Sequence, residues 1–304
     1  MELREMRSFA LLATCGSLQE VAERTQLSPA AVHQHLKSIE SRLGIRLYRR
    51  TPGRLLLTEP AKLMLPYVRE CLAQHESALA ALEDWRGAKK GTIRVGAGPS
   101  FCSYLLPALL KQFRRRAPGV EVFVESGTSA HLHEHLQSGS LDLIFDVNES
   151  AEPGESVIAG RWLSQAGFVG AASNVPPTLK LRDIQKRPFI LFQRGTPMEA
   201  AVQAYFNRLG FEPSVVMRSD SAEAIKAMVR AGLGLSVLNL WNVSNDLRSK
   251  SLVSVRTDAP PLEVSMALLR QRSGYVPSAL AEFVRVSLRV KWRYLTPIPL
   301  NDGA

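Results

Sequence analysis

The chain has 304 residues, enough for two domains or one large one, and its 45% apolar and 22% charged residues are typical of globular proteins. Lysine and arginine number 38 against 28 aspartates and glutamates, which favours a polyanionic partner such as nucleic acid, although the same balance suits plain solubility. A charged N-terminus, no apolar run near the roughly 20 residues of a membrane span, and three scattered cysteines argue against secretion, membrane insertion and disulfides. We therefore expect a cytoplasmic protein without a membrane partner.

The first part of the chain carries a helical pattern punctuated by helix-end signals. An apolar face that begins at Leu3 ends at Gly16, and residues 17–20, Ser-Leu-Gln-Glu, form a predicted capping box that opens a second short helix. After a brief turn, Ser28 and Pro29 are typical N-cap and first residues of a third helix, which we expect to reach Leu43.

The third predicted helix has two distinct faces. One is an apolar stripe made of Val32, Leu36, Ile39 and Leu43. The other is small or hydrogen-bonding and carries Ala30, His33, Gln34 and Lys37. Gln34 can pair bidentately with adenine, while His33 and Lys37 can meet guanine or phosphate. This arrangement predicts a helix-turn-helix, with an ordinary three-helix bundle as the alternative.

The segment after this helix is basic and reads as a hairpin. Apolar runs at residues 47–48 and 55–57 bracket Thr51-Pro52-Gly53, and a basic hairpin beside a recognition helix is typical of a wing. We therefore predict an all-α winged helix-turn-helix over residues 1–58. Its expected DNA contacts are Ser28, Pro29, Ala30, His33, Gln34, Lys37, Arg49, Arg50 and Arg54.

The pattern of apolar residues over 59–90 predicts one long linker helix. Its apolar positions repeat at spacings of four and three along Ala61, Leu65, Val68, Leu72, His75, Leu79 and Leu82. Such a heptad seam favours a paired helix and hence a homodimer or homotetramer, with packing on its own domain as the less favoured alternative. Pro66 inside the helix predicts a kink.

These features together resemble the LysR-type transcriptional regulators of bacteria. The matching segments are Phe9, residues 16–18, 22–24, 27–36, 39–40, 43–44, 47–50 and 57–61. Two departures stand out: Pro29-Ala30 follows Ser28 where relatives commonly have Gln-Pro or Gln-Ser, and His33 replaces a common Ser. The operator sequence can therefore differ from that of typical relatives.

Beyond residue 91 the pattern changes to alternating strands and helices, which predicts a parallel α/β architecture in two lobes. This half resembles the LysR effector domain, a two-lobed fold like that of periplasmic binding proteins, through residues 91–96, 105–107, 118–121, 139–143 and 221–234. We expect an effector domain over residues 91–294 and a tail over 295–304. Lobe I is expected at about residues 91–160 and 265–294, and lobe II at about 161–264.

Candidate effector contacts lie where loops meet helix N-termini, because free amides there favour carboxylates and phosphates. By the family resemblance these loops face the cleft between the lobes, which implies a transcription regulator controlled by a small anionic metabolite. The expected contacts are Ser100, Phe101, Thr128, Ser129, Arg194, Thr196 and Ser221. For each of them a plain helix cap or loop residue is the alternative.

Other functions receive less support. His131 and His135 share a helical face at the spacing of metal ligands, but no third ligand is evident, so we predict no metal and no cofactor. Cys102 lacks the second cysteine of peroxide-sensing relatives and is expected to be a spectator. The chain has no recognisable catalytic motif, which disfavours an enzyme, and the N-terminal segment disfavours a transport solute-binding protein.

Overall fold

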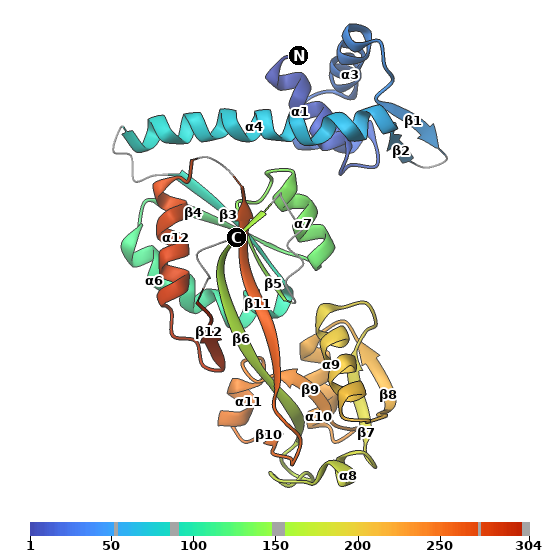
Figure 1. Ribbon diagram of the computed structural model, residues 1–304, viewed down its shortest axis with the longest axis vertical. Helices are drawn as coiled ribbons and strands as arrows, with labels where there is room; N and C mark the ends of the chain where they lie inside the picture. The colour runs from blue at the N-terminus through green and yellow to red at the C-terminus, as the bar shows by residue number, and fades with distance from the viewer. Residues whose placement is uncertain (52–53, 86–90, 148–155, 273–274, 300–304) are drawn as a thin grey trace.

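The computed structural model describes residues 1–51, 54–85, 91–147, 156–272 and 275–299, and Figure 1 shows three parts. An N-terminal unit packs on one end of a long helix, α4, and α4 lies across one end of a two-lobed α/β domain. Within the described ranges every helix is too short or too polar to span a lipid bilayer.

Three helices build the N-terminal unit: α1 (Leu3–Leu12), α2 (Leu18–Thr25) and α3 (Pro29–Leu43). The predicted caps are confirmed. The Ser17 hydroxyl accepts the Glu20 N–H at 3.2 Å, and the Glu20 carboxylate reaches back to the Gly16 N–H at 3.0 Å. The Ser28 hydroxyl accepts the Ala31 N–H at 3.1 Å. These signals are local in sequence, so they identify the helix starts without tertiary information.

The predicted wing is a two-stranded antiparallel hairpin of β1 (Tyr48–Thr51) and β2 (Arg54–Leu57). The Leu47 N–H donates to the Glu40 carboxylate at 2.8 Å, which ties the hairpin to α3. The Leu55 N–H donates to the Gly16 carbonyl at 2.8 Å, which ties it to the turn before α2. The turn residues Pro52 and Gly53 lie outside the described residues.

Helix α4 (Glu59–Trp85) contains the predicted heptad seam, but the seam divides between two roles. Ala61 and Val68 are 0% and 2% exposed within the core of the N-terminal unit, so this half packs on its own domain. Leu79 and Leu82, in the other half, are 50% and 55% exposed. The expectation of one continuous partner-facing seam is therefore wrong for the first half, because a seven-residue apolar repeat does not say which helix it meets.

Lobe I contains β3 (Gly91–Ala97), α5 (Pro99–Tyr104), α6 (Leu106–Arg116), β4 (Val120–Ser126), α7 (Ser129–Gln137) and β5 (Leu143–Val147). Strand β3 pairs in parallel with both β4 and β5, as predicted. Two helices, α5 and α6, precede β4 and are separated at Leu105. The cap of α7 is Thr128, whose hydroxyl accepts the His131 N–H at 3.4 Å, and Ser129 is the first residue of the helix.

Two long antiparallel strands, β6 (Ser156–Ala171) and β11 (Leu262–Gln271), connect the lobes (Figure 1). Their pairing runs from Leu262 opposite Ala166 to Gln271 opposite Ser156, so the lobe boundaries expected near residues 160 and 265 fall within these strands. The main sheet is consequently mixed and not parallel throughout. Repeated strand-helix units indicate only those strands that a crossover helix follows.

Lobe II contains α8 (Leu181–Ile184), β7 (Pro188–Phe192), α9 (Pro197–Arg208), β8 (Ser214–Ser219), α10 (Ala222–Arg230), β9 (Ser236–Asn239), α11 (Ser244–Arg248) and β10 (Leu252–Val255). Strands β7 and β8 pair in parallel, whereas β9 and β10 each pair antiparallel with β6. The lobe has its own aromatic core, in which the Phe206 and Phe211 rings stack with centroids 4.8 Å apart.

The chain returns to lobe I through α12 (Ser278–Arg289) and ends the described fold with β12 (Leu295–Pro297). Strand β12 pairs antiparallel with β6, placing Leu295 opposite Ser164. Residues 295–297 are therefore part of the domain and not of the expected tail. A three-residue strand has almost no periodicity of its own, and only its partner strand reveals it.

Candidate DNA interface and effector cleft

Helix α3 is fixed in the N-terminal unit by its apolar stripe. Val32, Leu36 and Ile39 are 0%, 0% and 1% exposed and pack against α1 and α2. Burial of each such side chain is worth roughly 1.5–3 kcal/mol. Leu43, the fourth member of the predicted stripe, is 49% exposed, because α3 reaches past the core there. The stripe therefore decides which face of α3 is left for solvent and partners.

The face of α3 that remains open carries the predicted base-reading residues. Ser28, Pro29, Ala30, Gln34 and Lys37 are exposed, and His33 is half-buried. Arg49 and Arg50 are exposed on β1, while the Arg54 side chain lies outside the described residues. Because Glu40 of α3 and Gly16 both hold the hairpin, α3 and the hairpin are fixed relative to each other, and both carry exposed basic side chains.

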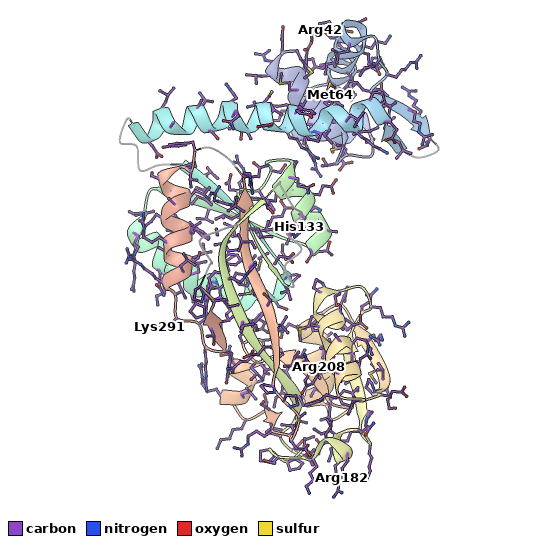
Figure 2. The ribbon with its side chains drawn as sticks, in the orientation of Figure 1. Arg42, Met64, His133, Arg182, Arg208 and Lys291 are labelled. Atoms are coloured by element: carbon purple, nitrogen blue, oxygen red, sulfur yellow. The ribbon has the colours of Figure 1, made fainter. Side chains whose placement is uncertain are left out.

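A buried carboxylate, that of Glu5, connects two helices of the same unit. Glu5 of α1 is 6% exposed and pairs with Arg42, which is labelled in Figure 2, near the end of α3. Burial by itself opposes ionisation, but the Glu2 N–H, Ser38 and the Arg42 guanidinium outweigh it and lower the pKa of Glu5 from 4.5 to about 2. Glu5 is therefore ionised at neutral pH and ties α1 to α3.

A cleft of about 570 Å³ opens between the two lobes, next to β5 and the N-terminal ends of α7 and α9. A space of this size suits a small metabolite. The residues that line it are Ser129, Ala130, His133, Glu134, Gln137, Asp146, Val147, Gly195, Thr196, Pro197 and Ala200.

Asp146 organises the lobe I wall of this cleft. It is 5% exposed and accepts hydrogen bonds from the Ser129 hydroxyl at 2.5 Å and the Val147 N–H at 2.8 Å, while His133 Nε2 lies 2.7 Å from its other oxygen. Burial raises the pKa of Asp146, but His133 and Ser129 more than offset this and lower it overall. The cleft therefore contains an ionised carboxylate that sequence reasoning missed, because Asp146 precedes no helix.

The structure brings together two of the predicted effector contacts. Ser129, the first residue of α7, and Thr196, the N-cap of α9, both line the cleft. The other five predicted contacts are not among the lining residues. Phe101 is 5% exposed and stacks on Phe145 in the lobe I core. Ser100, Thr128, Arg194 and Ser221 are partly or fully exposed, and Thr128 and Arg194 directly precede the lining residues Ser129 and Gly195. Thr128 and Ser221 act as helix caps.

The lobes make a polar contact through Lys226 of α10, which is 3% exposed. Its ammonium lies 3.1 Å from the Asp246 carboxylate and 2.5 Å from the Tyr104 hydroxyl of lobe I. Arg230 also pairs with Asp246, at 2.5 Å. A buried ammonium requires such partners, so this network ties α10, α11 and α5 together across the lobe boundary.

Helix α4 contacts lobe I at Asp84, near a hollow between the N-terminal unit and lobe I. Asp84 of α4 accepts the Ser278 N–H at 2.7 Å and the Ser278 hydroxyl at 2.6 Å, at the start of α12. Nearby, a hollow of about 770 Å³ separates the N-terminal unit from lobe I, and the C-terminal end of α7 borders it at Ser138 and Gly139. Its cationic lining is Arg4, Arg7, Arg24, Arg69, Arg94 and Arg270.

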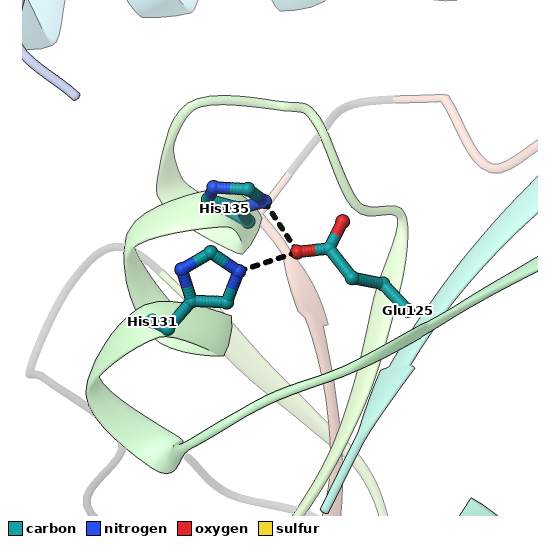
Figure 3. Close-up of side chains that lie close together, drawn as sticks. All are labelled: Glu125, His131 and His135. Atoms are coloured by element: carbon teal, nitrogen blue, oxygen red, sulfur yellow. Dashed lines mark hydrogen bonds and ion pairs between the residues drawn. The ribbon is translucent and has the colours of Figure 1, made fainter. Parts of the chain in front are cut away.

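The structure also bears on the predicted histidine pair of α7 and on Cys102. Glu125 of β4 lies against both His131 and His135, so a possible third ligand exists that the sequence did not reveal (Figure 3). Cys102 is half-buried, and burial raises the pKa of its thiol, which makes the reactive thiolate scarcer.

The family models match in the same order as these parts. Residues 3–62 match the bacterial regulatory helix-turn-helix protein of the lysR family, and residues 86–291 match the LysR substrate binding domain. The activator CmpR of Synechocystis is 28% identical over 279 residues, covering 89% of this chain and 90% of its own.

Solved structures agree in fold. Full-length OxyR from Pseudomonas aeruginosa, in a variant form, covers 94% of each chain with a TM-score of 0.74 and 22% identity. Full-length CbnR in complex with its target DNA covers 94% of this chain and 98% of its own, with a TM-score of 0.59 and 22% identity. With a DNA-binding unit, an effector domain and matches to both family models, the protein belongs to the LysR family of DNA-binding transcription regulators.

Proposed function

We propose that this regulator reads DNA with the exposed face of α3 and holds the backbone with the wing. Ala30, His33 and Gln34 lie toward the N-terminal end of α3, the end that meets base edges in helix-turn-helix proteins. Lys37, Arg49 and Arg50 supply phosphate contacts and salt-dependent affinity. A chromosomal target would place the protein in the cytoplasm.

We propose further that two copies pair through the apolar side chains of α4 that remain exposed. Leu63 and Tyr67 are 74% and 70% exposed on α4, and Leu79 and Leu82 continue as exposed apolar side chains toward its end. Exposed apolar positions along one helix favour burial against a second helix. A pair of DNA-binding units matches two half-sites, which explains why a dimer or a dimer of dimers suits this function.

The proposed effector site is the cleft between the lobes, and the observation that supports it is the meeting of Ser129 and Thr196 there. The N–H groups in the first turns of α7 and α9 favour an anionic group, as expected from the sequence, although Pro197 at the start of α9 contributes none. Glu134 and Asp146 add negative charge, and the described residues of the lining include neither lysine nor arginine. We therefore propose a small molecule with an acidic group for the helix ends and a hydrogen-bond donor or amine for Asp146.

Helix α7 offers the route from the cleft to the DNA-binding unit. Its first residue, Ser129, lines the cleft, and Ser138 and Gly139 at its other end border the hollow beneath the N-terminal unit. A ligand that binds the closed lobes more tightly shifts the population toward closure and moves α7 with lobe I. We expect the ligand to be released unchanged, in keeping with relatives that are regulators.

A thermal-shift screen of small polar acids and amino acids tests this site. A true effector raises the melting temperature through preferential binding to the folded state. Ser129→Ala together with Thr196→Ala should abolish the shift, whereas Thr196→Ser keeps the hydroxyl that caps α9 and should retain it. Ser100→Ala, outside the cleft lining, is the matched control. Loss of the shift in Ser100→Ala with full retention in the cleft variant would contradict the proposed site.

A further inference from the structure

Three potential metal ligands meet on one side of lobe I, outside the effector cleft. His131 Nε2 and His135 Nδ1 lie 2.6 and 2.8 Å from the same oxygen of Glu125, as Figure 3 shows. One ligand atom from each side chain lies within 4.8 Å of the other two. The two histidines are one turn apart on α7, and Glu125 comes from β4, the end strand of the sheet.

The contact with His135 is close but is not a good hydrogen bond. His135 is 7% exposed, and its Nδ1 is buried without a partner in hydrogen-bond geometry, although the Glu125 oxygen is near. Leaving a buried nitrogen in this condition is unfavourable, because the nitrogen has lost water without gaining a hydrogen bond. A metal ion between the nitrogen and the carboxylate removes that cost by accepting both lone pairs.

The surroundings leave the cluster open on one side. The side chains of His131 and Glu125 are 43% and 22% exposed, whereas His135 is nearly covered at 9%. Gly127 makes room for the His131 ring, because a Cβ at residue 127 would come within 2.7 Å of that ring. An ion held by these three residues therefore retains coordination positions for water.

We propose that Glu125, His131 and His135 form a site for one divalent transition-metal ion of the zinc type. Two imidazoles and one carboxylate are the donor set that suits Zn²⁺, Co²⁺ and Ni²⁺, while Mg²⁺ and Ca²⁺ prefer oxygen ligands alone. The bound form requires free lone pairs at His131 Nε2 and His135 Nδ1, so each neutral ring carries its proton on its other nitrogen.

This site occupies a different face of α7 from the effector cleft. His133, between the two ligands in sequence, bonds to Asp146 in the cleft, so the ion and the effector would contact the same helix from different sides. Metal binding would fasten α7 to β4 and make the position of α7 depend on the available metal. The site does not depend on the identity of the effector.

The test uses the untagged full-length chain, freed of metal with a chelator that is then removed. Titration with Co²⁺ and observation of its visible absorption report nitrogen and oxygen coordination, and Zn²⁺ should displace the Co²⁺ with one ion per chain. His131→Asn and Glu125→Gln should each weaken Zn²⁺ binding by more than roughly 10-fold. Loss of a residue that only hydrogen-bonds to a metal ligand already weakens binding by about this factor, and these variants remove a ligand itself. Both side chains are partly exposed, so the variants should fold, which circular dichroism verifies.

His133→Asn is the matched control, because it changes a histidine of the same helix that does not face the cluster. The proposal predicts that this variant keeps stoichiometric Zn²⁺ binding. Absence of Zn²⁺ binding by the wild-type chain, or equal affinity in wild-type, His131→Asn and Glu125→Gln proteins, would overturn it. Loss of binding in His133→Asn alone would likewise assign the metal to another site.

Discussion

Removal of the Asp246 carboxylate should reveal how much the lobe contact at Lys226 depends on buried charge. Lys226 and Asp246 have side chains only 4% and 8% exposed, and their ammonium and carboxylate lie 3.1 Å apart. Breaking a buried pair by truncating one member typically costs 3–5 kcal/mol, because the other charge stays buried. Glu223 remains 2.9 Å from Lys226 with a side chain that is 58% exposed, so we place the cost of Asp246→Ala at about 3 kcal/mol, the lower end.

Thermal unfolding followed by circular dichroism measures this cost. For a domain of this size each kcal/mol lowers the melting temperature by about 2–4 °C, so Asp246→Ala should lower it by roughly 6–12 °C. Glu223→Ala is the matched control, since it removes an exposed carboxylate from the same ammonium and should cost at most about 1 kcal/mol. The double variant Lys226→Met with Asp246→Leu should recover most of the loss. Equal losses for Asp246→Ala and Glu223→Ala would refute the reasoning.

The remaining predictions concern the DNA-binding unit. Gln34→Ala should weaken binding to the preferred DNA by about 1–3 kcal/mol. Lys37→Ala should weaken binding to all sequences and reduce the slope of log affinity against log salt concentration by about one in magnitude. Anisotropy titrations measure both effects. Because the folded-state pKa of Glu5 lies below its ordinary value, its stabilising contribution is complete above pH 4.5 and declines as the pH falls toward about 2. Since Arg42 is 45% exposed, we discount this contribution to about 1–2 kcal/mol, and Glu5→Gln should match wild-type stability only in acid. If the stability difference between wild type and Glu5→Gln were the same at about pH 3 and about pH 7, the ionised carboxylate would not be the source of the stabilisation.

The parts of the fold that local signals specify could be predicted from the sequence. Ser17 and Ser28 cap their helices as expected, and the stripe on α3 identified the face that carries Gln34. A cap or a helical stripe involves residues within a few positions of each other, so the linear sequence contains the necessary information.

Features that depend on distant partners were not predictable in the same way. Asp146 enters the cleft because β5 pairs with β11. Glu125 and His131 are only six residues apart, but one lies in a strand and the other in the next helix, and no repeating pattern spans the two elements to indicate their contact. The first half of the α4 repeat packs on its own unit, a choice that its spacing does not express. Phe101 was expected in the effector site because it follows a strand, but its apolar ring is buried in the lobe I core, where it is more stable than in contact with water.

The most direct test of the central claim is the selection of DNA from the fragmented genome by the purified full-length protein, followed by anisotropy titration with excess unrelated DNA. The account predicts that a few discrete sequences are enriched, that their binding survives the competitor, and that Gln34→Ala removes the preference while leaving salt-sensitive binding. Absence of enrichment, with all fragments displaced equally by the competitor, would contradict the assignment of α3 and the wing as a sequence-reading surface.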